Sequence, residues 1–281
     1  MALLRAQHSM RTACRLAGLS THALYYRPER NTRPLNPESI ELVRKVVEDR
    51  PFYGSRKVAA SIRRNGTRLN RKAVQRIMRA MDWTLPARKR ERAAANTAKP
   101  VFVPTAPDQL WETDITYIWC GTDRWGYLFN HLDVFTRQWL AYTFSSNMRK
   151  RNAIDSLVNA VDGRDTTQLM LRSDNGSQFT SDEFMDSVKA LGIRQEFIQV
   201  STPEQDGHIE SFHGTLKTEY IWPMEFSSFE EALECIEKAF CDYNNVRLHS
   251  ALGYMTPNEY YRKWMREHGK EVKPSILYPA K

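Results

Sequence analysis

The pattern of apolar residues changes partway along the chain, and this change limits the possible folds. Up to about residue 83 the apolar residues recur at helical spacing. After residue 106, short runs rich in aromatic and β-branched residues follow one another at 110–119, 126–135 and 138–144. Such runs are typical of strands, and their close succession predicts three antiparallel neighbours. The chain is therefore expected to join an all-α region to a domain built on a β-sheet.

Helices and strands alternate after these three strands. The expected elements are a helix at about 150–161, a strand from Leu169 that ends in Asp174, a helix with a capping box of Thr180 and Glu183, and a strand at about 193–198. A further helix is expected to start near Thr202, with Gly207 in its first turn, and the last clear helix to be capped by Ser228 and Glu231. This succession predicts an α/β fold with a mixed sheet and flanking helices.

The region before residue 84 is predicted to consist of short helices. Residues 11–25 are compatible with a helix-turn-helix. Three helices are then expected to begin at Asn36-Pro37, at a Ser55 cap and at an Asn70 cap. The third helix should turn Val74, Ile77, Met78 and Met81 inward, which leaves Arg71, Lys72, Gln75, Arg76 and Arg79 on its opposite side.

Charge divides the chain in the same way. Residues 1–100 hold 23 Lys and Arg against 7 Asp and Glu, a net of +16, whereas residues 101–281 hold 18 against 26, a net of −8. A basic module joined to an acidic domain favours nucleic-acid binding, and a helix with one basic face suits a major groove or a phosphate backbone. For any single side chain an ordinary solvated face is the simpler reading. The predicted DNA contacts of the helical region are Arg56, Lys57, Arg71, Lys72, Arg76 and Arg79.

Composition sets the domain boundaries. We expect a helical DNA-binding region at 1–83, a basic Ala/Pro-rich linker at 84–106, a catalytic core at 107–265 and a C-terminal tail at 266–281. The four cysteines form no pair with zinc-ligand spacing. Because the sequence shows no apolar run of membrane-spanning length and no signal-peptide pattern, a cytoplasmic setting without a membrane partner is the default expectation.

Three acidic residues stand in separate polar signatures. Asp114 lies in Trp-Glu-Thr-Asp, Asp174 in Ser-Asp-Asn-Gly-Ser-Gln-Phe, and Glu210 in Asp-Gly-His-Ile-Glu-Ser. Mg²⁺ prefers oxygen ligands, and a pair of such ions can stabilise the attacking and the leaving oxygen of a phosphoryl transfer. Taken singly, each acid has the simpler role of a solvated or capping residue. Their flanking residues make the set a candidate two-metal site.

The signatures resemble those of DDE transposases and retroviral-type integrases. The matching parts are W-x-T-D-I-T around Asp114, SDNGSQF at Asp174, and DG-x-x-ES-x-x-x-x-x-K at Glu210, which follows Asp174 after 35 residues. A tail that includes His249-Ser250-Ala251-Leu252-Gly253 and the helical segment YGSRKVAASIRRNG match as well. Over nearly the whole chain, the similarity is greatest to the second-frame product (OrfB) of the bacterial insertion sequence three family.

The resemblance implies a ribonuclease H-like core whose acidic trio binds two Mg²⁺ or Mn²⁺ ions. Such enzymes cut DNA at the ends of the element and join the freed 3′-hydroxyl to target DNA. It places Lys217 against the DNA end, and His213, which faces the same way, is predicted to contact that DNA, with an exposed helix residue as the alternative. It also implies double-stranded DNA partners (terminal inverted repeats and target DNA), a homo-oligomer on DNA, and an upstream-frame partner or fusion. Asp206 departs from the superfamily, where Asn or Gln is common.

Two other functions stay open at this point. A nuclease of ribonuclease H-like type would cut without joining, although the helical region and the tail signature argue against it. A DNA-binding regulator of transposition would perform no chemistry, and such a protein would have no need of all three acids. Joining activity, cleavage alone and binding alone would distinguish the three functions.

Overall fold

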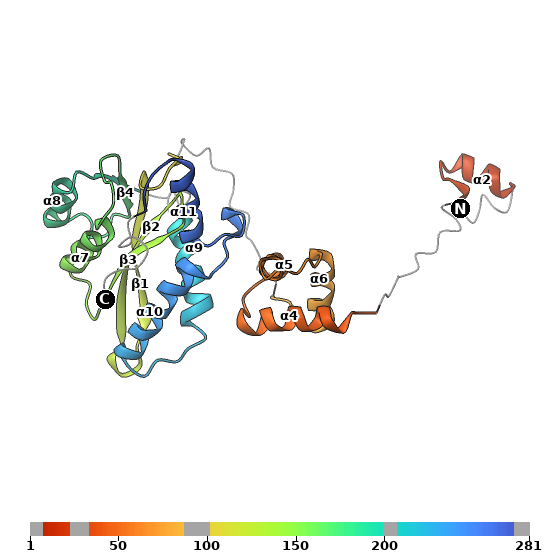
Figure 1. The fold of residues 1–281 in the computed structure, drawn as a ribbon, viewed down its shortest axis with the longest axis horizontal. Helices are drawn as coiled ribbons and strands as arrows, with labels where there is room; N and C mark the ends of the chain where they lie inside the picture. The colour runs from red at the N-terminus through yellow and green to blue at the C-terminus, as the bar shows by residue number, and fades with distance from the viewer. Residues whose placement is uncertain (1–7, 23–33, 87–101, 199–206, 273–281) are drawn as a thin grey trace. The chain divides into compact units, whose positions relative to one another are not determined.

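The computed structural model describes residues 8–22, 34–86, 102–198 and 207–272, and all structural statements concern these ranges. The chain separates into two compact units, 1–40 and 41–281 (Figure 1). The first unit contains helix α2 (Met10–Leu16), which Ser9 caps by accepting a hydrogen bond from the Thr12 amide. The remainder of the predicted helix-turn-helix, from residue 23 to residue 25, lies outside the described residues.

Three helices follow at the expected places: α4 (Pro37–Asp49), α5 (Ser55–Arg64) and α6 (Arg71–Ala80). The Asn70 side chain caps α6, as predicted, by accepting from the Lys72 amide at 2.8 Å. Two details were wrong. The cap residue of α5 is Gly54, with Ser55 as the first helical residue, and Met81 ends α6 with its side chain partly exposed. The helix stops one residue before the apolar repeat does.

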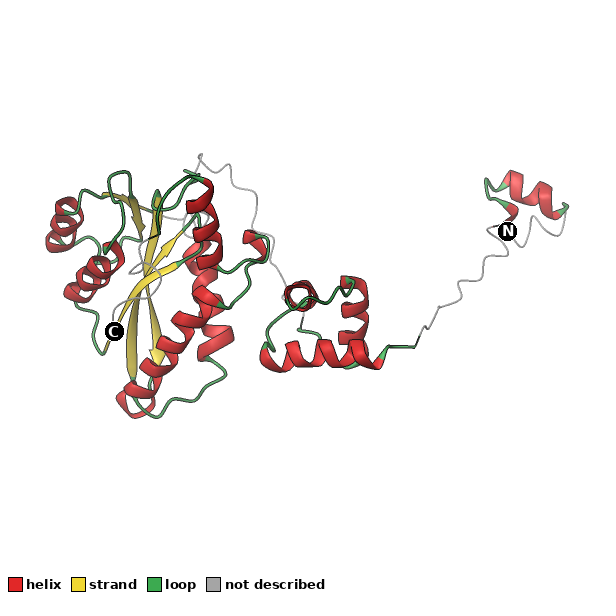
Figure 2. Ribbon diagram, viewed as in Figure 1, coloured by secondary structure: helices red, strands yellow, loops and turns green. Residues whose placement is uncertain are grey.

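Five strands form one mixed sheet, shown in yellow in Figure 2. They are β1 (Leu110–Trp119), β2 (Trp125–Asp133), β3 (Trp139–Ser145), β4 (Met170–Ser173) and β5 (Arg194–Phe197). Their order is β3-β2-β1-β4-β5. The first three strands are antiparallel neighbours, as predicted, while β4 and β5 run parallel to β1. The ribonuclease H-like mixed sheet is confirmed.

Helices cover both faces of the sheet (Figure 2). On one face α7 (Lys150–Val161) and α8 (Asp182–Ala190) enclose a core that includes Trp111 and Phe129 of the sheet. On the other face α9 (Gly207–Leu216) and α10 (Phe229–Asn245) pack on Ile118 and Leu128. Because side chains alternate along a strand, odd-numbered residues of β1 face α7 and α8, and even-numbered residues face α9.

The structure corrects one helix prediction, adds one helix and leaves one prediction untested. Ser181, not Thr180, is the cap residue of α8, and the Thr180 hydroxyl donates to the Gly176 carbonyl instead. A helix that the sequence analysis missed, α11 (Pro257–Glu267), follows α10 and begins with a capping box of Thr256 and Glu259. The helix start expected near Thr202 lies outside the described residues. Across the described ranges, no helix is long and apolar enough to span a membrane.

Candidate active site

Asp114 lies on the face of β1 that α9 covers. Its side chain shares this face with Glu112 and Thr116 because the three residues alternate along the strand. The pairing of β1 with β2 places Asn130 directly opposite Asp114. The Asp114 carboxylate keeps 24% of its side-chain exposure, whereas Asn130 is fully buried. One side of the carboxylate is thus enclosed by protein, and the other is open to a ligand.

His213 of α9 lies beside the Asp114 carboxylate. The Asn130 amide nitrogen lies 3.0 Å from His213 Nε2 and also donates to the Leu128 carbonyl at 3.2 Å. An amide nitrogen can only donate, so Nε2 accepts and the imidazole proton is on Nδ1. His213 Nδ1 lies 3.3 Å from Asp114 Oδ2. The network therefore places the protonated ring nitrogen of His213 beside the Asp114 carboxylate.

Asp174 lies next to Asp114 at the carboxyl end of β4. The parallel register pairs Thr113 with Ser173, and the next residues along the two strands are Asp114 and Asp174. Partial burial raises the pKa of Asp174, and the negative charge of Asp114 raises it further. Open α/β sheets place ligands at the carboxyl ends of their strands. Two carboxylates that repel each other at such an edge are suited to a cation.

The loop after Asp174 depends on a glycine. The Gly176 amide donates to Asp174 Oδ1 at 2.9 Å, and a Cβ atom at Gly176 would stand 2.9 Å from the same oxygen. The Asn175 side chain donates to the Ile198 carbonyl, and the Gln178 side chain donates through Nε2 to the Met148 carbonyl. Polar bonds to both flanks thus hold the loop in place, and only a glycine leaves the carboxylate where it is.

Glu112 attaches the start of α9 to the sheet. Its buried carboxylate accepts from the Ile209 amide at 2.8 Å and lies 3.3 Å from His208 Nδ1. Arg172 of β4 is 3.7 Å away and also donates to Glu196 of β5 at 2.7 Å. Burial raises the pKa of Glu112 to about 7, against the lowering effect of the Ile209 amide and of Arg172. This anchor determines where the first turn of α9 lies over β1.

Glu210 is exposed in the first turn of α9. It stands three residues before His213, so the two side chains share a side of the helix, and His213 contacts Asp114. The structure thus brings Asp114 and Asp174 together, while the position of the Glu210 side chain relative to them stays a prediction from its helical spacing to His213. In the described part of the chain, no three acidic, His or Cys side chains are already gathered closely enough to hold a metal ion. Asp206 lies outside the described residues.

Some of the predicted DNA-contacting side chains are exposed, and others are covered by protein. The side chains that lie exposed on α5 and α6 are Arg56, Arg71, Lys72, Arg76 and Arg79. Lys57, by contrast, is largely covered and forms an ion pair with Glu219 at 3.7 Å. Lys217 begins a π-helical turn, η3 (Lys217–Ile221), that continues α9, and His213 is buried against Asp114. His213 therefore has a protein partner that the sequence did not indicate.

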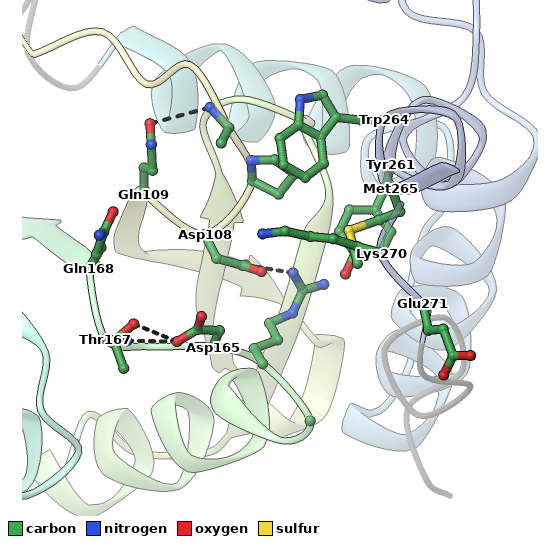
Figure 3. A pocket seen from close by; sticks show the side chains of 14 residues that line it. Asp108, Gln109, Asp165, Thr167, Gln168, Tyr261, Trp264, Met265, Lys270 and Glu271 are labelled. Carbon is green, nitrogen blue, oxygen red and sulfur yellow. Dashed lines mark hydrogen bonds and ion pairs between the residues drawn. The ribbon is translucent and has the colours of Figure 1, made fainter. Parts of the chain in front are cut away.

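Two hollows lie near these elements without containing the acidic trio. The larger, of about 530 Å³, is lined by Asp108, Arg164 and Trp264 among others (Figure 3). It borders the amino ends of β1 and β4 and so lies away from the acids. The smaller, of about 290 Å³, is lined by residues of α5, α9 and the segment after α10.

Sequence reasoning missed two residues that position the site, Glu112 and Asn130. The sequence did contain a signal for Glu112, because a residue two positions before Asp114 lies on the same face of the strand. A buried carboxylate on that face needs a hydrogen-bond partner. Nothing in the sequence links Asn130 to His213, which are 83 residues apart. Their contact follows from the strand register and from the packing of α9.

Comparison with known proteins finds matches to both parts of the chain. Family models described as an HTH-like domain and as an integrase core domain match residues 35–91, 104–203 and 191–257. The transposase for insertion sequence element IS904 of Lactococcus lactis is 28% identical over 226 residues, which cover 76% of this chain and 88% of the relative. InsK of insertion sequence element IS150 of Escherichia coli K12 is 30% identical over 226 residues, 76% of this chain and 78% of the relative.

A solved structure of the HTLV-2 integrase catalytic core domain in complex with magnesium is also similar. It is 17% identical with a TM-score of 0.44 and covers 56% of this chain and 98% of that one. The sheet order, the integrase core and HTH-like matches and the two relatives lead to one assignment. The chain belongs to the DDE transposases of bacterial insertion sequences, the group that includes the second-frame products of the insertion sequence three family.

Proposed function

We propose that this transposase cuts DNA at the ends of its element and joins the freed 3′-hydroxyl to target DNA, with Asp114, Asp174 and Glu210 holding two Mg²⁺ or Mn²⁺ ions. The observation that carries the proposal is the adjacency of Asp114 and Asp174 on parallel strands, with the helix of Glu210 anchored above them. Their hard oxygen donors and the raised pKa of Asp174 fit a divalent cation. When bound, two ions stabilise the attacking and leaving oxygens.

The protein's own residues supply orientation and DNA binding. His213 holds the Asp114 carboxylate, and Glu112 holds the start of α9, so that Glu210 approaches the two aspartates from a fixed direction. Lys217, one turn beyond His213, contacts the DNA end by its ammonium group. The exposed cations of α5 and α6 bind phosphates or a major groove. The helical region therefore selects and holds the DNA, and the sheet domain performs the chemistry.

The partners follow from the reaction. Terminal inverted repeats and target DNA are the two double-stranded substrates, and the synapsis of two ends requires at least two copies of the chain. An upstream-frame protein, fused or separate, is a further partner. The named relatives come from bacteria, so we place the reaction on DNA in the bacterial cytoplasm.

The test is incubation of the full chain with labelled duplexes that carry the element's ends, with Mg²⁺ or Mn²⁺ added. We expect products in which the labelled 3′ end is covalently joined to another duplex. Cleavage without joined products would support a nuclease instead. Retention of the duplex without any chemistry would support a DNA-binding regulator.

A further inference from the structure

The hollow of about 290 Å³ is lined by more positive charge than the protein neutralises. Lys57 of α5, Arg137 of the β2–β3 turn, and Arg247 after α10 all contribute to its wall. Glu219 accepts two bonds from Arg247, at 2.7 and 2.6 Å, and lies 3.7 Å from Lys57. The Glu219 carboxylate thus forms ion pairs with two cations, and it forms none with Arg137.

Arg137 has no bonded acceptor for one of its guanidinium nitrogens. Its Nη1 is buried and has no hydrogen-bond partner within the described structure. Burial lowers the pKa of Arg137, and Tyr243, Glu112 and Asp133 oppose this lowering without forming a hydrogen bond to the guanidinium. Those two carboxylates are engaged elsewhere: Glu112 with the start of α9, and Asp133 with the amide and hydroxyl of Thr136. Arg137 is half-buried, and a partly enclosed guanidinium without an acceptor is costly unless an anion supplies one.

The backbone at Arg137 adds to this observation. Its φ angle is 61°, in the left-handed region that a side chain with a Cβ rarely adopts. Such strain persists where the surrounding structure requires the side chain in one direction, and it collects at ligand sites. The turn is held by the Arg137 amide, which donates to the Asp133 carbonyl at 2.9 Å. The fold thus holds this guanidinium at the hollow.

The rest of the wall offers donors for an anion and few acceptors. Ser211 and Thr215 of α9 line the hollow, as do Gly207 and His208 in the first turn of that helix. Helix amino termini favour anions through their free N–H groups. His249, also in the wall, stays neutral because burial and the charges of Arg247 and Lys57 lower its pKa to about 2. The volume lies just below the usual range of ~300–1,000 Å³ for pockets that enclose whole small molecules.

We propose that this hollow binds one phosphate of the DNA backbone through Arg137 and Lys57, with Ser211 and Thr215 as hydroxyl donors. The proposal rests on the proposed function and extends it. The hollow joins α5 of the helical DNA-binding region to α9, which carries Glu210 on another side. A DNA strand that runs from the acids toward the helical region therefore passes it. Arg247 contributes only its positive electrostatic potential, because its guanidinium nitrogens already contact Glu219 and His249.

The first test measures how the affinity of the full chain for end duplexes depends on salt. Each neutralised phosphate contributes about 0.9 to the slope of log K against log salt concentration. Arg137→Gln is expected to lower the slope by about 0.9, and Lys57→Met to lower it similarly. Lys238→Gln removes the same charge from an exposed position on α10 and should leave the slope unchanged. Wild-type slopes in both hollow variants would overturn the proposal.

A second measurement separates free phosphate from the DNA backbone and detects a folding defect. Without DNA, Arg137→Gln should melt at the wild-type temperature or above it, because an unpaired buried charge is removed. A lower melting temperature would assign Arg137 a structural role and count against the proposal. If inorganic phosphate raises the melting temperature of the wild type while both variants keep the wild-type slope with DNA, the hollow binds free phosphate only, and the proposal is wrong. A wild-type chain that binds no DNA would instead overturn the proposed function itself.

Discussion

At the scale of single residues, Gly176 determines where the Asp174 carboxylate can lie. A Cβ atom at this position would be 2.9 Å from Asp174 Oδ1, so Gly176→Ala must displace the carboxylate. We expect strand joining to fall at least tenfold while the melting temperature changes little, since the displaced atoms end a flexible side chain. The control is Gly214→Ala in α9, where a Cβ atom meets nothing within 4 Å. Equal activity of the two variants would contradict this role of Gly176.

His131 makes the stability of the fold sensitive to acid. The imidazole is buried in β2, both ring nitrogens lack partners in the described structure, and burial lowers its pKa to about 3. The unfolded chain binds a proton below its ordinary value of about 6.5. The neutral form therefore stabilises the fold above pH 6.5, and this contribution is lost as the pH falls toward 3.

Replacement of His131 by leucine should remove this dependence. Between pH 6.5 and 4.5 the wild type is expected to lose stability faster than His131→Leu, by roughly 1.4 kcal/mol for each pH unit. Denaturant unfolding of both proteins across this range provides the comparison. The carboxylates are common to both proteins and cancel in the difference. Parallel curves would mean that His131 finds a proton acceptor in the folded protein.

At the scale of elements, the position of α9 depends on the Glu112 anchor. Glu112→Ala removes the acceptor of the Ile209 amide and leaves a buried donor unsatisfied, which costs about 1–3 kcal/mol. We expect a lower melting temperature and a loss of joining, because Glu210 lies one residue after Ile209. Glu112→Gln keeps a carbonyl oxygen for the amide and should retain more of both properties. If the two variants behave alike, the anchor has been assigned to the wrong interaction.

Element prediction succeeded where the local sequence decided the outcome. The aromatic and β-branched runs indicated β1, β2 and β3, and the acids could be assigned to a strand, a strand end and a helix. The misses have physical causes. Thr256, Pro257 and Glu259 form a complete helix-start signal, and the short apolar repeat that follows it in α11 went unrecognised. The π-helical turn after α9 is set by packing, and no residue type marks it.

At the scale of the whole molecule, contacts between distant segments join the helical region to the sheet domain. Arg50 binds Asp242 through two hydrogen bonds of 2.7 and 2.6 Å, and the Tyr53 hydroxyl accepts from the Leu248 amide at 2.9 Å. Arg64 pairs with Glu259. These partners are more than 190 residues apart, and nothing in the local sequence of either partner links them. The charge division predicted a DNA-binding region, but it gave no indication that Arg50, Tyr53, Lys57 and Arg64 contact the sheet domain.

The central claim is that Glu210 completes a metal-binding trio with Asp114 and Asp174. The most direct measurement compares strand joining and end-duplex binding by the wild type, by Glu210→Gln and by Glu225→Gln, an exposed carboxylate outside the site. Glu210→Gln should abolish joining and leave binding nearly intact, because the helical region still contacts the DNA. Glu225→Gln should match the wild type in both. Joining that persists in Glu210→Gln, or binding that is lost along with joining, would contradict the account.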